Sequence, residues 1–216
     1  MLEGLVIDGR GHGVCVWVGP SSHIRLKNNL IRNCGSNGIY GSVADDGSGG
    51  QDLQFDGNEI TNIAMEHSSP PGSHAIYFTG NQSLIRGNYI HPPCPFYGIH
   101  ATSELGGLHS NVFENNRVVG CSNAGLYSQG SNSIIRNNLL ENNCIGIYLA
   151  SAPTQVLHNT VYGHAAANCS DSYGLLDSSG GSTIANNLVL QQQLYIYTLK
   201  DPPTLTTNLC DGTGTT

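Results

Sequence analysis

One asparagine recurs every 21 to 30 residues along most of the chain, each time within a short pattern of spaced apolar residues. An apolar residue lies three positions before it and another two positions after it, as in "LIRGNYI" and "IIRNNLL". The recurring residues are Asn29, Asn58, Asn88, Asn116, Asn138, Asn159 and Asn187. About ten residues later, or further on where residues are inserted, a second strand-like segment follows, such as "GIYGS" or "GIYLA". Because a unit of this length cannot bury its apolar residues by itself, the repeats must stack on one another.

The repeat predicts an all-β fold, a parallel β-solenoid of about seven or eight rungs with an asparagine ladder. At ~4.8 Å per rung, the rungs would form a rod roughly 35 Å long. Each ladder amide can donate a hydrogen bond to one neighbouring rung and accept one from the other. A leucine-rich repeat has a similar period, but it requires a leucine-dominated pattern and usually a helix, whereas strand-forming residues fill the unit here.

These "I-x-x-N-x-I … G-I-Y" rungs resemble the right-handed parallel β-helix of the pectin-lyase-like superfamily. The resemblance covers residues 2–199 and implies a single β-helix domain, residues 1–200, without the usual N-terminal capping helix. We expect residues 201–216 to form an irregular tail. The superfamily includes polysaccharide lyases, epimerases, polygalacturonases, phage tailspikes and non-catalytic surface proteins. "GHG" at 11–13 and "RLK" at 25–27 are similar to polygalacturonase motifs, but the companion acidic motifs are absent.

Two columns of residues should point outward, because successive side chains of a strand alternate between its faces. The first column alternates in charge from rung to rung and should stabilise the register of the stack: Lys27, Asp56, Arg86, Glu114 and Arg136. The second is largely aromatic: Cys15, Tyr40, Tyr77, His100, Tyr127, Tyr148, Leu176 and Tyr197. Aromatic residues are favoured in strands anyway, but a stacked column would also offer sugars apolar rings and hydrogen-bonding groups.

Four insertions, at 41–50, 63–73, 101–109 and 163–172, interrupt the shorter rungs, and three of them flank the aromatic column. Loops on a rigid scaffold often carry function. The candidate catalytic residues are therefore Tyr77, His100, His74 and Tyr40, since histidine and tyrosine can act as acids and bases. Candidate substrate-binding residues are Tyr127, Tyr148 and Glu104. The loops lack Lys and Arg, so a Ca²⁺ ion would have to neutralise a bound carboxylate; its candidate ligands are Asp45, Asp46, Asp52 and Glu66.

Charge and composition exclude other classes of function. A net charge of −7 with only two lysines argues against nucleic acid binding, and no apolar run approaches a membrane span. The seven cysteines form no CxxC pair, and we expect mostly free, buried thiols. Adjacent-rung bridges Cys94–Cys121 or Cys121–Cys144 would be geometrically allowed, and Cys169 with Cys210 could tie an insertion to the tail.

The sequence thus favours an extracellular or cell-surface protein that acts on a polysaccharide by uronate lyase or epimerase chemistry. The alternative is a non-catalytic β-helix that binds glycans or serves as a structural, self-assembling module. Exposed sheet edges at the two ends of the rod would permit end-to-end association, and side-by-side association is the other arrangement.

Overall fold

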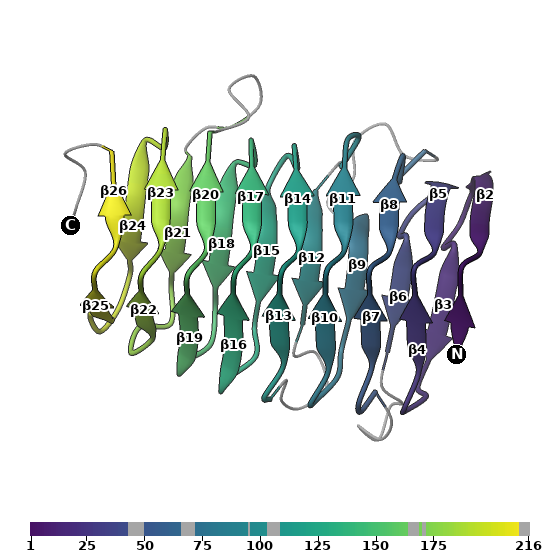
Figure 1. The fold of residues 1–216 in the computed structure, drawn as a ribbon, viewed down its shortest axis with the longest axis horizontal. Helices are drawn as coiled ribbons and strands as arrows, with labels where there is room; N and C mark the ends of the chain where they lie inside the picture. Colours follow the sequence, from purple (N-terminus) through teal and green to yellow (C-terminus); the bar gives the residue numbers. More distant parts are fainter. Residues whose placement is uncertain are drawn as a thin grey trace.

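The chain forms a parallel β-solenoid built from three sheets that run along one long axis (Figure 1). The computed structural model describes residues 1–42, 50–65, 72–94, 96–102, 109–163, 169 and 172–211. Each full rung contributes one strand to each sheet, and all pairings between strands are parallel. No helix occurs among the described residues, so none of them forms a helical membrane span.

Sheet A contains β1 (Leu2–Glu3), β4 (Arg25–Lys27), β7 (Gln54–Asp56), β10 (Leu84–Arg86), β13 (Val112–Glu114), β16 (Ser133–Arg136), β19 (Thr154–Leu157), β22 (Thr183–Ala185) and β25 (Thr204–Thr206). Sheet B contains β2 (Val6–His12), β5 (Leu30–Cys34), β8 (Glu59–Thr61), β11 (Tyr89–His91), β14 (Arg117–Val119), β17 (Leu139–Glu141), β20 (Thr160–Tyr162), β23 (Leu188–Leu190) and β26 (Leu209–Cys210). Sheet C contains β3 (Val16–Gly19), β6 (Ile39–Gly41), β9 (His74–Phe78), β12 (Tyr97–Ala101), β15 (Ala124–Ser128), β18 (Ile145–Leu149), β21 (Tyr173–Asp177) and β24 (Leu194–Thr198).

The core fills the space between the three sheets with one row of apolar side chains from each. The rungs place like residues above one another, so that Phe55, Ile85 and Phe113 form a continuous buried row on sheet A. Stacking therefore supplies the burial that a single repeat cannot provide.

The asparagine ladder is confirmed and runs through the bend between sheets A and B. Each buried amide donates to the side-chain oxygen of the next ladder asparagine, as in Asn88 Nδ2 to Asn116 Oδ1 at 3.0 Å and Asn116 Nδ2 to Asn138 Oδ1 at 2.9 Å. Asn208 extends the series by accepting a bond from Asn187 at 2.9 Å. The left-handed backbone of this bend belongs to the residue before each ladder position, for example Asn115 with a φ of 56°.

The alternating charge column on sheet A is also confirmed. Its members lie in register on neighbouring strands, and ion pairs join Arg86 to Asp56 at 2.5 Å and Arg136 to Glu114 at 2.6 Å. Glu3 extends the alternation by pairing with Lys27 at 3.5 Å. The basic side chains of these pairs are exposed to solvent, so each pair contributes about 1 kcal/mol or less to stability.

The expectation of mostly free thiols is wrong. Disulfides join Cys15 to Cys34, Cys94 to Cys121 and Cys144 to Cys169. The parallel stack brings Cα atoms of neighbouring rungs to between 4.6 and 5.4 Å, within bonding range. Of the two adjacent-rung bridges that the sequence allows, the first forms and Cys121–Cys144 does not, while Cys210 remains free rather than pairing with Cys169.

The segment after residue 200, expected to be irregular, continues the solenoid. Strand β25 pairs with β22 and strand β26 pairs with β23. The apolar pattern of a rung persists there, since Leu205 aligns with Ile184 and Cys210 with Val189. The described part of this segment is therefore a further, partial rung.

Candidate functional site

Aromatic side chains stack in register along the outer face of sheet C. The pairing places Tyr40, Tyr77, His100, Tyr127 and Tyr148 directly next to one another on successive strands, as the sequence predicts. At the N-terminal end the sequence-based assignment is wrong: Trp17, not Cys15, aligns with Tyr40. Together these six residues form a column that we call the aromatic strip.

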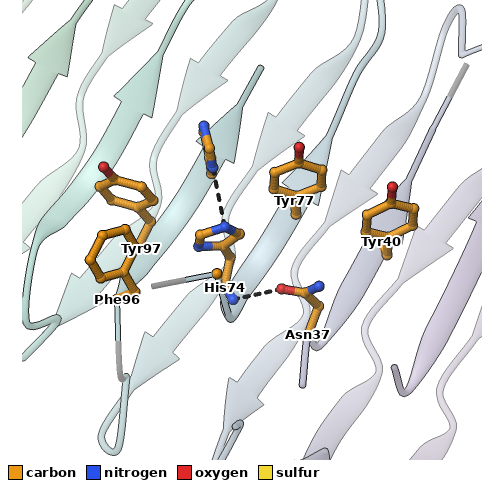
Figure 2. A pocket seen from close by; sticks show the side chains of 8 residues that line it. Asn37, Tyr40, His74, Tyr77, Phe96 and Tyr97 are labelled. Carbon is orange, nitrogen blue, oxygen red and sulfur yellow. Dashed lines mark hydrogen bonds between the residues drawn. The ribbon is translucent and has the colours of Figure 1, made fainter. Parts of the chain in front are cut away.

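Apart from the exposed Trp17, the rings of the strip contact one another, and they are half-buried except for Tyr77, which is buried. Tyr40 and Tyr77 are nearly parallel, with centroids 5.2 Å apart and an interplanar angle of 7°, and their hydroxyls point the same way (Figure 2). Tyr127 and Tyr148 stack at 4.5 Å. Because neighbouring rings cover these faces, the strip presents hydroxyl and ring edges to a ligand, rather than the broad faces on which sugars commonly stack.

A second row of side chains lies beside the strip because sheet C departs from strict alternation. Strict alternation would turn His74, three positions before Tyr77, toward the core. Instead, both residues between them, Ala75 and Ile76, are buried, and His74 lies on the same side of the sheet as Tyr77. A Cβ added at Gly98 would lie 2.3 Å from Val118 Cγ1, which shows that this small residue points into the core. Consequently His74 lies beside Tyr77, with ring centroids 5.1 Å apart, and Tyr97 lies beside His100 at 4.8 Å.

His74 and His100 form a hydrogen-bonded pair at the centre of this cluster. His74 Nε2 and His100 Nδ1 are 3.2 Å apart, and the His74 backbone N–H donates to Asn37 Oδ1 at 2.6 Å (Figure 2). The outer ring nitrogens, His74 Nδ1 and His100 Nε2, are buried without a hydrogen-bond partner among the described residues. Since neutral imidazole has one donor and one acceptor, the shared bond leaves one outer nitrogen protonated and the other unprotonated.

The cluster is uncharged at neutral pH. Burial, with a smaller contribution from the charge of His100, lowers the pKa of His74 to about 3. Burial lowers the pKa of His100 to about 4. Burial, followed by the nearby phenols of Tyr127 and Tyr148, raises the pKa of Tyr97 to about 12.

A cavity of about 420 Å³ opens beside the strip at this point. Strip residues of β6, β9 and β12 form one side of the cavity, and residues at or just before the start of these strands form the other. Its walls are aromatic rings, two imidazoles and one amide. The lining residues are Asn37, Tyr40, Gly72, His74, Tyr77, Phe96, Tyr97 and His100. The volume suits one or two sugar units, and the tyrosine hydroxyls and the Asn37 amide supply hydrogen-bond donors and acceptors.

The structure brings together all four candidate catalytic residues, Tyr77, His100, His74 and Tyr40, as lining of one cavity. Tyr127 and Tyr148 continue the strip away from it. The remaining loop candidates, Glu104, Asp45, Asp46 and Glu66, lie outside the described residues, as do most of the insertions.

Asp52, the fourth candidate Ca²⁺ ligand, lies just before β7 on sheet A. Its carboxylate accepts hydrogen bonds from His23 at 2.9 Å and from Gln54 at 2.9 Å. These partners lower the pKa of Asp52, with His23 as the larger cause. Among the residues that the structure describes, no group of three His, Cys, Asp or Glu side chains is placed to hold a metal ion.

Sequence reasoning missed Trp17 of the strip and three residues that line the cavity: Asn37, Phe96 and Tyr97. A signal for one of them was present, because Tyr97 precedes His100 by three positions just as His74 precedes Tyr77. The register pairs Tyr97 with His74, so this equal spacing reflects a true second column.

The comparisons with known proteins identify the fold. A family model described as "Right handed beta helix region" matches residues 10–189. No curated protein sequence matches the chain at a significant level.

Three solved structures illustrate the similarity. The ORF18 protein of Geobacillus virus E2 has a TM-score of 0.72 and 16% identity, and the match covers 98% of this chain and 42% of that chain. DFA-IIIase from Arthrobacter chlorophenolicus A6, in complex with GF2, has a TM-score of 0.62 and 14% identity, covering 92% and 48%. The Dettilon tailspike protein (gp208) has a TM-score of 0.51 and 14% identity, covering 97% and 55%. The chain thus spans about half the length of these structures, and at such low identity the likeness shows the fold alone.

Proposed function

The chain belongs to the right-handed β-helix family, and from this starting point we propose that it binds a polysaccharide along the aromatic strip of sheet C. The observation that carries the proposal is the in-register column of Tyr40, Tyr77, His100, Tyr127 and Tyr148 with a cavity at one end. A repeating ligand suits a repeating surface, because successive sugars can meet equivalent side chains on successive rungs. The cavity would hold a terminal or bent unit of the glycan.

Recognition on this face would depend on hydrogen bonds more than on ring stacking. Tyr40 and Tyr77 stack on each other, and their hydroxyls point in the same direction (Figure 2). Each hydroxyl bonded to a sugar contributes on the order of 1 kcal/mol. Removing one hydroxyl should therefore weaken binding about five-fold, and removing two should weaken it about 25-fold.

Phenylalanine substitutions test this proposal while preserving the stacked rings. Tyr40→Phe and Tyr77→Phe, singly and together, are compared with Tyr162→Phe on sheet B by isothermal titration with a panel of oligosaccharides. We expect weaker binding in the first three variants and unchanged binding in the control. Equal affinities for Tyr40→Phe/Tyr77→Phe and Tyr162→Phe would refute the assignment of the binding face.

Acid–base processing of the bound glycan is a second candidate, favoured by the contact between His74 Nε2 and His100 Nδ1. Neutral imidazoles can accept a proton from a sugar carbon or return one, as lyase and epimerase chemistry requires. The outer nitrogens are covered, so a side chain would have to move before either one could reach a ligand. Uronate substrates would also require a neutralising group, for which Ca²⁺ held by loop carboxylates remains the prediction.

Incubation with uronate polymers, with and without Ca²⁺, tests this second candidate. Absorbance of the unsaturated uronate product reports elimination, and proton exchange at sugar C5 reports epimerisation. His74→Gln, which keeps a side-chain N–H but removes the imidazole, should abolish either activity. Absence of both activities with every polymer would leave the non-catalytic binding function.

Location and assembly follow as further parts of the proposal. Three disulfides are typical of proteins in oxidising compartments, which supports an extracellular or cell-surface location. Self-association remains a prediction; the end rungs carry exposed apolar side chains, including Val6 at one end and Leu209 at the other.

A further inference from the structure

Seven of the eight basic residues of this chain lie on strands of sheets A and B. All eight lie within the described residues, and none belongs to a strand of sheet C. Sheet A holds Arg25, Lys27, Arg86 and Arg136; sheet B holds Arg10, Arg32 and Arg117; Lys200 follows the last strand of sheet C. The face that carries the aromatic strip therefore offers no guanidinium or ammonium group from its own strands.

Most of these cations also have acidic partners on their own sheet. On sheet A, Lys27, Arg86 and Arg136 pair with the carboxylates of the charge column. On sheet B, Arg32 Nε lies 3.1 Å from Asp8 and Arg117 Nε lies 2.6 Å from Glu141. These five cations thus lie on strands of sheets A and B, and not on the sheet that carries the strip.

The strip and its cavity supply only neutral groups at neutral pH. The cavity is lined by phenols, a phenyl ring, an amide and two imidazoles that burial keeps unprotonated. The single charged residue in the strands of sheet C, Asp177, is fully buried and accepts bonds from Ser179 and the Gly180 backbone.

The segments at 43–49, 66–71 and 103–108 add no positive charge, because their sequences contain Asp45, Asp46, Glu66 and Glu104 but no Lys or Arg. Wherever these segments lie, they can make the electrostatic potential of this face only more negative, apart from protonation of His67.

An anionic sugar is poorly matched to such a surface. Moving a carboxylate or sulfate out of water without a positive partner costs several kcal/mol, more than one or two hydrogen bonds return. The chain's net charge of −7 also repels a polyanion during approach. We propose that the glycan bound along the aromatic strip is uncharged, composed of sugars without free carboxylate, sulfate or phosphate groups. This inference rests on the proposed function and narrows its ligand class.

A glycan array that pairs neutral and anionic oligosaccharides of similar length tests the inference, with and without Ca²⁺. One matched pair is an oligogalacturonide and its full methyl ester, which differ in charge but share a backbone. Hits are confirmed by titration at 50 and 500 mM NaCl with the wild type and the Tyr40→Phe/Tyr77→Phe variant. We expect only uncharged glycans to bind, with less than a two-fold change in Kd between the two salt concentrations.

The outcomes separate the two proposals. An anionic glycan that binds, with or without Ca²⁺, and loses affinity in the double variant would overturn the uncharged class but leave the binding face intact. A neutral glycan that binds equally well to the double variant would overturn the binding face. Absence of binding to every glycan would remove the proposed function and this inference together.

Discussion

Replacing one central asparagine of the ladder tests how the rungs are held together. Asn116 is buried and makes four side-chain hydrogen bonds. Its Oδ1 accepts from Asn88 N at 3.1 Å and from Asn88 Nδ2 at 3.0 Å, and its Nδ2 donates to Ile85 O and to Asn138 Oδ1, each at 2.9 Å. The Asn116→Ala substitution removes all four and leaves buried donors and acceptors on both neighbouring rungs without this partner.

At about 1 kcal/mol for each bond, the loss is about 4 kcal/mol, and more where a buried group stays unsatisfied. This is a large fraction of the stability of an ordinary domain. We therefore expect Asn116→Ala to shift the midpoint of equilibrium unfolding in urea strongly to lower concentrations, as followed by far-ultraviolet circular dichroism.

Asn115→Gly is the matched control on the same rung. Asn115 is exposed, has a φ of 56°, and occupies the position held by Gly87 and Gly57 on the two preceding rungs. Glycine suits this backbone, so the control should change stability by less than about 1 kcal/mol. Equal unfolding midpoints for the two variants would refute the view that the ladder is a main source of cohesion between rungs.

Three further predictions concern the cluster and its support. Because the pKa values of His74 and His100 lie below the unfolded value of about 6.5, the unfolded state takes up protons first; stability should fall as the pH drops from 6.5 to 4, by up to about 1.4 kcal/mol per pH unit for each histidine, and a His74→Phe/His100→Phe variant should show a shallower decline in pH-dependent urea unfolding. Gly98→Ala should cost about 1–3 kcal/mol in the same assay, since its Cβ would lie 2.6 Å from a backbone oxygen and 2.3 Å from a core methyl; unchanged stability would contradict the inward orientation. Replacing both Cys94 and Cys121 by serine should lower the free energy of unfolding by about 2–4 kcal/mol, because it removes the disulfide between them. An Ellman assay that finds more than one free thiol in the wild-type protein would contradict the pairing.

The fold could be predicted from the sequence because several independent features repeat with the same spacing. The ladder asparagines, the apolar pairs around them and the alternating charges all require the same register. Misaligning one rung would have moved its residues out of every column at once. The alignment that places Asn88 in the ladder also places Arg86 in the charge column, so the two assignments agree. Trp17 was missed because the pairing of β2 with β5 shifts register between Asp8 and His12, so the spacing counted on later rungs does not apply to the residues that follow.

The site could be predicted only in part, because it depends on a departure from alternation. His74 shares a face with the strip because the two residues between it and Tyr77, Ala75 and Ile76, both face the core, and Tyr97 does so in the same way. The bonding of His74 to His100 and the mutual stacking of Tyr40 and Tyr77 depend on side-chain orientation, which spacing does not encode. The pairing of the cysteines was also not predicted from spacing. Cys15 bonds Cys34 and Cys144 bonds Cys169, although the two members of each pair occupy different positions within their repeats.

The most direct test of the account is to map a bound oligosaccharide onto the tyrosine rings. Eight of the ten tyrosines lie on strands of sheet C, and the other two, Tyr89 and Tyr162, lie on sheet B. With ring-labelled tyrosine, NMR spectra recorded during titration should show shifts for Tyr40 and Tyr77 and none for the two sheet B residues. Shifts centred on Tyr89 or Tyr162, with Tyr40 and Tyr77 unmoved, would contradict the central claim that sheet C is the binding face.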